Sequence, residues 1–226
     1  IGYAHPDDRV ICYLKYAPKA SGRWSIGNRY ERMMPQYTML NLLKGFTFLE
    51  KEYPHYIFDS EALGVRISAV PHDYIKQHYS ADEILHQFFK TDNLDRLRSM
   101  AKELAARLAE ESHISVGSFG ITGSILIGIH NLEFSDLDLV VYGFGNSLKV
   151  RSALMKQYDD ERGDFQKLSG ELLHKWCLEK SSSYPITYGE ALEFYRRKWN
   201  YGLYKGRIFS VHPVRLETEI KEFYGD

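Results

Sequence analysis

Residues 134–142 read Phe-Ser-Asp-Leu-Asp-Leu-Val-Val-Tyr, and this stretch decides how the second half of the chain is expected to fold. Its polar and apolar side chains alternate, which is the pattern of a β-strand with one buried face. Asp136 and Asp138 therefore point to one side of the predicted strand, and the neighbouring leucines point to the other. In an extended strand the two aspartate Cα atoms are roughly 6.6 Å apart. We predict a strand over residues 135–142 that presents two carboxylates on one face.

The two carboxylates can be interpreted in two ways. Like charges on one face repel each other unless a cation lies between them. Oxygen ligands of this kind suit Mg²⁺ or Mn²⁺, and such a pair can bridge two metal ions that stabilise the attacking and leaving oxygens of a nucleotidyl transfer. The alternative is an edge strand whose outward face is simply acidic, and an Asp-x-Asp pattern taken by itself favours that alternative.

A turn of small residues precedes the acidic strand. Residues 123–128 read Gly-Ser-Ile-Leu-Ile-Gly, and Gly123 lies 13 residues before Asp136. Glycine lets the backbone approach a ligand closely, and Ser124 offers an N–H and a hydroxyl to phosphate oxygens. A tight strand-to-helix turn would need the same small residues, so the Gly-Ser pair is informative only together with the acidic strand.

A regular helix is expected before these motifs, and further elements after them. Residues 91–112 carry apolar side chains at three- and four-residue spacing, with Asp92 as the expected N-cap and Asp95 at its third position. A strand over residues 114–119 leads into the Gly-Ser turn. After the acidic strand we expect helices over 147–158, 171–180 and 189–200, and a late strand over 207–211 that Pro213 stops.

Residues 1–90 are interpreted as a separate, strand-rich α/β module. Residues 10–16 and 65–70 are rich in β-branched and aromatic side chains, as expected of strands. Shorter apolar runs occupy residues 46–49 and 56–58, and a short helix is expected within 76–89. We expect the second domain, residues 91–226, to carry the functional site.

The order of helix, strand, Gly-Ser turn and acidic strand resembles the polymerase-beta-like nucleotidyltransferase superfamily. The family pattern is a hydrophobic residue, then Gly followed by Gly or Ser, and after a short connection two acids that alternate with hydrophobic residues. Here residues 121–124 read Ile-Thr-Gly-Ser and residues 135–139 read Ser-Asp-Leu-Asp-Leu. The wider stretches 120–129 and 134–143 resemble a mainly archaeal group of predicted nucleotidyltransferases.

This resemblance implies an α/β (α+β) protein in which a nucleotidyltransferase-type mixed sheet with flanking helices follows the strand-rich module. It implies a metal-dependent enzyme that transfers a nucleoside monophosphate from an NTP to an acceptor by a two-metal mechanism. Asp136 and Asp138 would be the catalytic residues that hold Mg²⁺ or Mn²⁺, and Gly123 and Ser124 would bind the nucleotide. The acceptor stays open between an RNA 3′ end, a protein side chain and a small molecule.

Two departures from the family pattern keep other interpretations open. Residues 125–127 are Ile-Leu-Ile, where many members carry a basic residue. Active members also place a third carboxylate on a later strand, and residues 207–211 contain none. The candidates for a third ligand are Asp164, His212, Glu217 and Glu219. The alternative function is a non-catalytic nucleotide- or RNA-binding protein that keeps the fold, and a phosphohydrolase with the same metal pair is a third possibility.

Residues 194–201 interleave aromatic side chains with Arg and Lys. Such a composition suits single-stranded nucleic acid, whose bases stack on rings while cations contact the phosphates. The alternative is an amphipathic helix with an aromatic core face and a solvated basic face.

The overall composition sets limits on partners and location. The 226 residues include 29 Lys and Arg against 30 Asp and Glu, a formal net charge of -1, so no global basic field draws the protein to nucleic acid or an anionic membrane. No apolar run reaches the ~18 residues that a membrane span needs, so no membrane partner is expected. Cys12 and Cys177 form no disulfide framework or zinc pattern, which is typical of a cytoplasmic protein.

Overall fold

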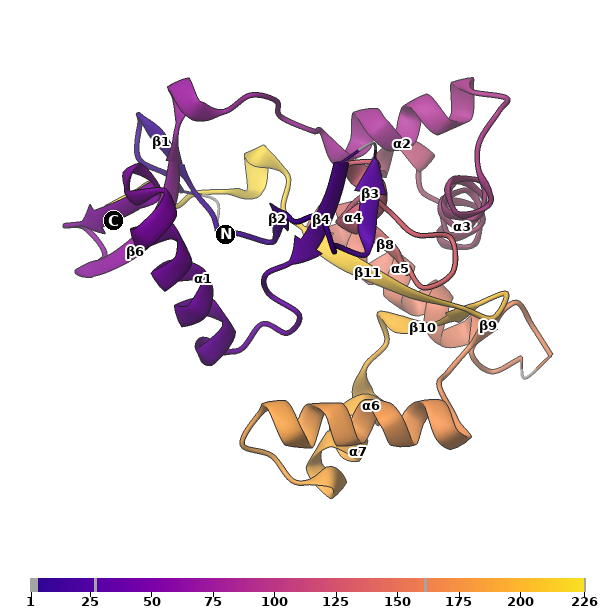
Figure 1. The fold of residues 1–226 in the computed structure, drawn as a ribbon. Helices are drawn as coiled ribbons and strands as arrows, with labels where there is room; N and C mark the ends of the chain where they lie inside the picture. The colour runs from indigo at the N-terminus through magenta and orange to yellow at the C-terminus, as the bar shows by residue number, and fades with distance from the viewer. Residues whose placement is uncertain (1–3, 27, 161, 226) are drawn as a thin grey trace. The chain divides into compact units, whose positions relative to one another are not determined.

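The computed structural model describes residues 4–26, 28–160 and 162–225 and divides into two compact units (Figure 1). The first unit comprises residues 1–78 together with 220–226, and the second comprises residues 79–219. The division falls at residue 78 rather than near residue 90, because helix α2 (Ala81–Lys90) packs on strand β7 (Phe119–Ile121) of the second unit. The fold is mixed α+β. Among the described residues, no helix combines the length and the apolar character needed to cross a membrane.

The first unit contains two small antiparallel sheets and a helix. One sheet has the strand order β1-β6-β5 and the other has the order β2-β4-β3. The bounds are β1 Arg9–Ile11, β2 Tyr16–Pro18, β3 Trp24–Ile26, β4 Asn28–Arg32, β5 Ile57–Ser60, β6 Val65–Pro71 and α1 Met39–Glu52, with short 3-10 turns at Pro54–Tyr56 and His72–Tyr74.

Two expectations for the first unit are corrected. Residues 10–16 do not form one strand, since β1 ends at Ile11 and Tyr16 begins β2 in the other sheet. Residues 46–49 lie inside helix α1, where Gly45 and Leu49 are buried against the sheet. The apolar run there belongs to a helix face, which a four-residue window cannot distinguish from a strand.

A five-stranded mixed sheet forms the centre of the second unit. Its strand order is β7-β8-β11-β10-β9, in which β8 and β11 run parallel and the other neighbours run antiparallel. Helices α3 and α5 pack on each other and on β8. The remaining bounds are β8 Leu137–Tyr142, β9 Phe165–Gln166, β10 Tyr201–Tyr204, β11 Arg207–Val214, α3 Arg96–Ser112, α4 Gly123–Leu126, α5 Phe144–Gln157, α6 Gly170–Ser183 and α7 Tyr188–Arg197, with short 3-10 turns at Val116–Ser118 and Glu217–Glu219.

Helix α3 carries the apolar stripe that the sequence predicts. Its side chains at three- and four-residue spacing are fully buried in the main core of this unit: Leu97, Ala101, Leu104, Ala105 and Leu108. The helix begins later than expected, however. Asp95 is the N-cap, and its Oδ1 accepts hydrogen bonds from the amides of Leu97 at 2.9 Å and Arg98 at 3.0 Å. Asp92 lies outside the helix and has no capping role.

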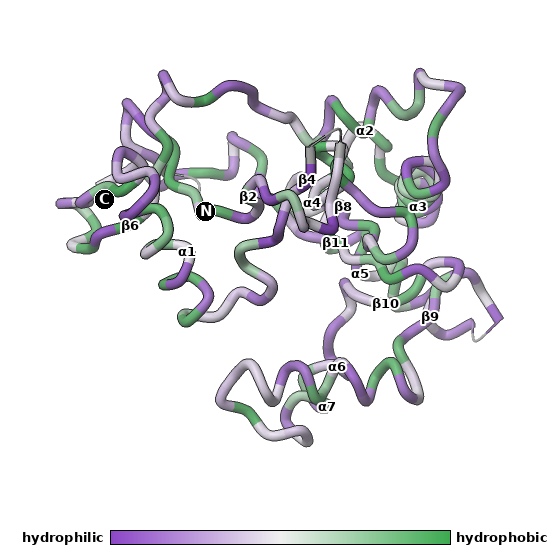
Figure 2. The backbone as a smooth tube through the Cα atoms, viewed as in Figure 1, coloured by the Kyte–Doolittle hydropathy of each residue, from purple (hydrophilic) through white to green (hydrophobic). Residues whose placement is uncertain are grey.

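Helices α6 and α7 pack around a second, smaller core that includes Trp176 and Tyr195. Both helices alternate between hydrophobic and hydrophilic stretches, as the colours of Figure 2 show. Helix α7 ends at Arg197, and Tyr201 already begins β10, so the helix expected up to residue 200 is too long. Strand β11 in turn continues through Pro213 to Val214. Proline is tolerated there because the pairing of β11 with β10 extends only as far as Ser210.

Candidate functional site

The acidic strand places its two carboxylates at its beginning. Strand β8 starts at Leu137, so Asp136 stands in the loop just before it and is exposed. Asp138 is the second residue of the strand, and its side chain is 20% exposed. The alternation is confirmed, since Leu137, Leu139 and Val141 are fully buried on the opposite face.

Arg207, the first residue of β11, holds the loop that leads to Asp136. Its guanidinium donates hydrogen bonds to the carbonyl oxygens of Glu133 at 2.8 Å and Leu132 at 2.9 Å. Within the loop, the amide of Asn131 donates to Ser135 Oγ at 2.9 Å. Sequence reasoning missed this role, because Arg207 is 71 positions beyond Asp136 and carries no motif of its own.

The Gly-Ser turn lies directly against the second carboxylate. Gly123 has a φ of +69°, and a Cβ atom at this position would be 2.6 Å from Asp138 Oδ2. The amide of the preceding residue, Thr122, donates to the Asp138 carbonyl oxygen at 2.8 Å. The structure therefore brings together the two motifs, and glycine is required at residue 123 both for its backbone conformation and for the close approach.

Ser124 is oriented differently from the sequence-based expectation. It is 5% exposed, and its hydroxyl donates to Ser135 Oγ at 3.2 Å. The hydroxyl thus joins the Gly-Ser turn to the loop before Asp136. A phosphate contact from this residue would use its backbone N–H in the present arrangement.

The strand beside Asp138 carries a serine and a histidine, where the resemblance predicts a third acid. Ser210 on β11 is opposite Asp138 in the parallel register, and its hydroxyl donates to Asp138 Oδ1. His212 Nε2 lies 2.8 Å from Ser210 Oγ and 3.9 Å from Asp138 Oδ1. Because the serine donates its single proton to Asp138, we assign the Nε2 proton to His212. A histidine nitrogen that carries a proton cannot ligate a metal, so His212 would have to change tautomer to serve as a ligand through Nε2, the nitrogen beside Ser210.

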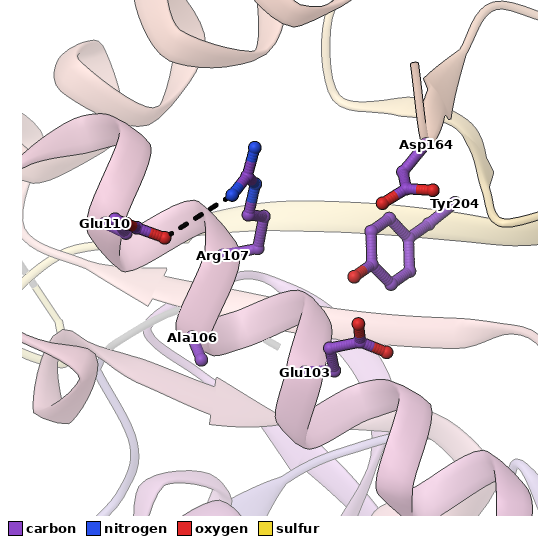
Figure 3. A pocket seen from close by; sticks show the side chains of 6 residues that line it. All are labelled: Glu103, Ala106, Arg107, Glu110, Asp164 and Tyr204. Atoms are coloured by element: carbon purple, nitrogen blue, oxygen red, sulfur yellow. Dashed lines mark ion pairs between the residues drawn. The ribbon is translucent and has the colours of Figure 1, made fainter. Parts of the chain in front are cut away.

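The other candidates for a third carboxylate lie elsewhere. Glu219 accepts hydrogen bonds from the amides of Phe144 and Leu216, each at 3.0 Å, and so sits at the opposite end of β8 from Asp136. Glu217 belongs to the same 3-10 turn. Asp164 lines a separate cavity of about 320 Å³ with Tyr204 and helix α3 (Figure 3). Among the described residues, no trio of His, Cys, Asp and Glu side chains is placed to hold a metal ion.

Tyr201 borders the carboxylate pair from the far side of β11. The register of the sheet aligns Tyr201 with Ser210 and Ser210 with Asp138, so the three residues form one row across β10, β11 and β8. Burial raises the pKa of Tyr201, and the negative charges of Asp136, Glu179 and Asp138 raise it further. Glu179 on α6 is thus a further acid whose charge acts on Tyr201. Sequence reasoning placed none of Tyr201, Glu179 and Ser210 at the site, although apolar and polar residues alternate over residues 209–212 and assign Ser210 and His212 to one face of β11.

The oxygen donors of the site suit a metal ion that is shared with substrate phosphates better than one held by the protein alone. Mg²⁺ in nucleotide-using sites is commonly held by one or two carboxylates together with substrate phosphates and water. Asp136 and Asp138, with the Ser210 hydroxyl beside them, match that description. A fully protein-made cage would need more ligands than the described residues provide here.

Comparison with known proteins finds a relative whose name states no activity. The chain is 27% identical over 227 residues to the Uncharacterized protein MJ1086 of Methanocaldococcus jannaschii. The alignment covers 99% of this chain and 66% of that protein, so the chain spans slightly less than two thirds of its relative's length. No family model matches the chain. No solved structure matches it either.

Proposed function

We propose that this chain is a metal-dependent nucleotidyltransferase, which transfers a nucleoside monophosphate from an NTP to an acceptor. The observation that carries the proposal is the contact between Gly123 and Asp138, where a side chain larger than hydrogen would meet the carboxylate at 2.6 Å. A phosphate-binding turn and a metal-binding carboxylate must be neighbours if both are to hold the same nucleotide. The residues of the two motifs meet that requirement, although 14 intervening residues separate them along the chain.

Each group in this site has a proposed task. Asp136 and Asp138 hold Mg²⁺ or Mn²⁺ together with the phosphates of the NTP, and the backbone at Gly123 and Ser124 faces those phosphates. The metal supplies positive charge that stabilises the transferring phosphoryl group and the departing pyrophosphate. Ser210 fixes the rotamer of Asp138 through its hydrogen bond.

A second candidate function is a non-catalytic nucleotide- or RNA-binding protein that keeps this fold. The observation that favours it is the pair Ser210 and His212, which occupies the strand position where active relatives of the superfamily would place a third carboxylate. Such a protein would bind a nucleotide with a metal ion and would not release pyrophosphate.

The two functions are separated by a turnover assay combined with a binding measurement. The protein is incubated with labelled NTPs and Mg²⁺ or Mn²⁺, and pyrophosphate release and label transfer are followed while calorimetry measures NTP binding. We expect metal-dependent binding and turnover that Asp138→Asn abolishes. Asp164→Asn, which removes an exposed carboxylate from the separate cavity, is the matched control and should retain both. Equal turnover by Asp138→Asn would overturn the site, and binding without turnover by the wild type would favour the second candidate.

A further inference from the structure

An exposed aromatic ring lies on the helix pair α6 and α7, which precedes strand β10. Phe194, near the end of α7, is 60% exposed. Its ring is nearly parallel to that of Trp176 on α6, with an interplanar angle of 7° and centroids 6.4 Å apart. Trp176 is only 7% exposed and belongs to the small core of this helix pair. The Phe194 ring is therefore parallel to a buried ring and offset from it, while its own side chain remains open to solvent.

Two lysines flank this ring. Lys198 Nζ lies 5.7 Å from the centroid of Phe194 and 5.9 Å from that of Tyr201. Lys180 Nζ lies 5.5 Å from the centroid of Trp176 and pairs with Glu179 at 3.0 Å. We call the five side chains of Trp176, Lys180, Phe194, Lys198 and Tyr201 the lysine–aromatic patch.

The charges of the patch are not balanced. Within the part of the chain that the structure describes, Lys198 contacts aromatic rings and makes no ion pair with a carboxylate. Burial and the like charge of Lys180 both lower the pKa of Lys198. A third lysine, Lys167, donates its ammonium to the carbonyl oxygen of Lys198. Cations held this close repel each other, and an anion bound among them would relieve that repulsion.

The patch is continuous with the carboxylate pair through Tyr201. Lys198 Nζ lies over the ring of this tyrosine, and its register partner Ser210 is hydrogen-bonded to Asp138. A ligand on the patch would therefore approach the place where the proposed reaction occurs.

We propose that the lysine–aromatic patch binds single-stranded nucleic acid as the acceptor, with a base stacked on Phe194 and the adjoining phosphates at Lys198 and Lys180. This inference rests on the proposed function and names the substrate class that the function leaves open. An exposed ring beside lysines, of which Lys198 makes no ion pair with a described carboxylate, is the combination that sequence-tolerant single-strand binding uses, since every base has a face to stack and every nucleotide link carries a negative charge. A bare triphosphate or an acidic peptide would pair with the lysines and would have no base to stack on the Phe194 ring.

The test measures binding of a fluorescent single-stranded RNA octamer by anisotropy, in EDTA and without NTP. We expect Phe194→Leu to weaken binding about tenfold, because stacking is lost. Lys198→Gln should weaken binding and lower the slope of log affinity against log salt by about 0.7, the value for one phosphate contact on a single strand. Lys198→Arg should restore both. Arg196→Gln is the matched control, since Arg196 is an exposed cation two residues before Lys198 that pairs with Glu193, and it should leave binding unchanged.

Three outcomes would overturn the patch. The first is that the octamer does not bind. The second is that Lys198→Gln and Arg196→Gln lose equal affinity for the octamer. The third is complete displacement of the octamer by tripolyphosphate at equal phosphate concentration, which would assign the patch to the NTP. Asp138→Asn separates this inference from the proposed function. The octamer should bind Asp138→Asn as tightly as the wild type, since the patch does not include this carboxylate. Octamer binding by a wild-type protein that releases no pyrophosphate supports the patch and rejects the transferase. Pyrophosphate release by the wild type, together with octamer binding that the patch variants leave unchanged, supports the transferase and rejects the patch.

Discussion

A Cβ atom on Gly123 would lie 2.6 Å from Oδ2 of Asp138, so the turn and the carboxylate can keep their places only if residue 123 has no side chain. Gly123→Ala combines this clash with a φ of +69°, which alanine rarely adopts. We expect the variant to lose about 1–3 kcal/mol of unfolding free energy and to lose metal-dependent NTP binding. Urea denaturation and calorimetry measure the two effects.

The control for this prediction is Gly145→Ala. Gly145 lies in helix α5, has no heavy atom within 4 Å of an added Cβ and does not have a positive φ. Alanine favours a helix over glycine by about 1 kcal/mol, so this variant should be as stable as the wild type or more so. Equal changes of stability and NTP binding in the two variants would contradict the requirement for glycine beside Asp138.

Arg207→Gln is expected to loosen the loop that carries Asp136. The guanidinium donates to the carbonyl oxygens of Leu132 and Glu133, and a glutamine is too short and has too few donors to replace both bonds. Hydrogen exchange should increase over residues 131–136, and the affinity for the NTP with its metal should fall while the stability falls by about 1–3 kcal/mol. Unchanged exchange in that loop would contradict the role given to Arg207.

Ser210→Asp introduces a carboxylate opposite Asp138. Without a metal ion the two like charges repel, so the thermal midpoint should fall, and Mg²⁺ or Mn²⁺ should raise it more than in the wild type. If the chain is a transferase limited by its missing third acid, pyrophosphate release should also increase. Ser152→Asp, on the exposed surface of α5, provides the same charge change away from the site and should show no metal-dependent shift. Equal shifts in the two variants would reject metal binding at Asp138.

The N-cap of helix α3 gives a prediction that depends on pH. Burial acts to raise the pKa of Asp95, but the hydrogen bond from the Arg98 amide and the adjacent His130 side chain outweigh it, so the pKa is lowered overall. A carboxyl whose pKa is lower in the folded state contributes stability above its unfolded pKa, and that contribution is lost as the pH falls through the folded pKa. Asp95→Ala should therefore cost about 1 kcal/mol at pH 7.

The same difference should shrink below about pH 4, where the carboxyl of the unfolded chain becomes protonated, and should disappear below the lowered pKa of the folded state. Urea denaturation at neutral and acidic pH measures it. Asp92→Ala serves as the comparison, because Asp92 is exposed and precedes the helix. A larger loss in Asp92→Ala than in Asp95→Ala would show that the helix begins earlier than the structure indicates.

Patterns confined to a few neighbouring residues were predicted well. The alternation around Asp138 identified a strand with one buried face, and the apolar spacing of α3 identified its buried stripe. Each of these signals repeats within one element and needs no knowledge of what packs against it. The N-cap of α3 was misassigned because Asp92 and Asp95 are both acceptable capping residues, and only the tertiary fold selects between them.

Relationships between distant elements were not predictable. Nothing in the sequence indicates that Ser210 lies opposite Asp138, because register between two strands depends on the whole sheet. The segment before Tyr201 has good helix-forming residues, and its early end is imposed by the pairing of β10 with β11. Whether a third acid would converge on the site was likewise a question of topology, which the order of residues alone leaves open.

The parallel pairing of β8 and β11 also makes the candidate site a late product of folding. Asp138 and Ser210 are 72 residues apart, and α5, α6 and α7 lie between their strands. Closing so long a loop costs entropy before the contact is formed, so parallel pairing of this kind is slow. Those helices can form from local contacts well before the strands meet. A chain arrested before β11 is synthesised should therefore be rich in helix and unable to retain a nucleotide.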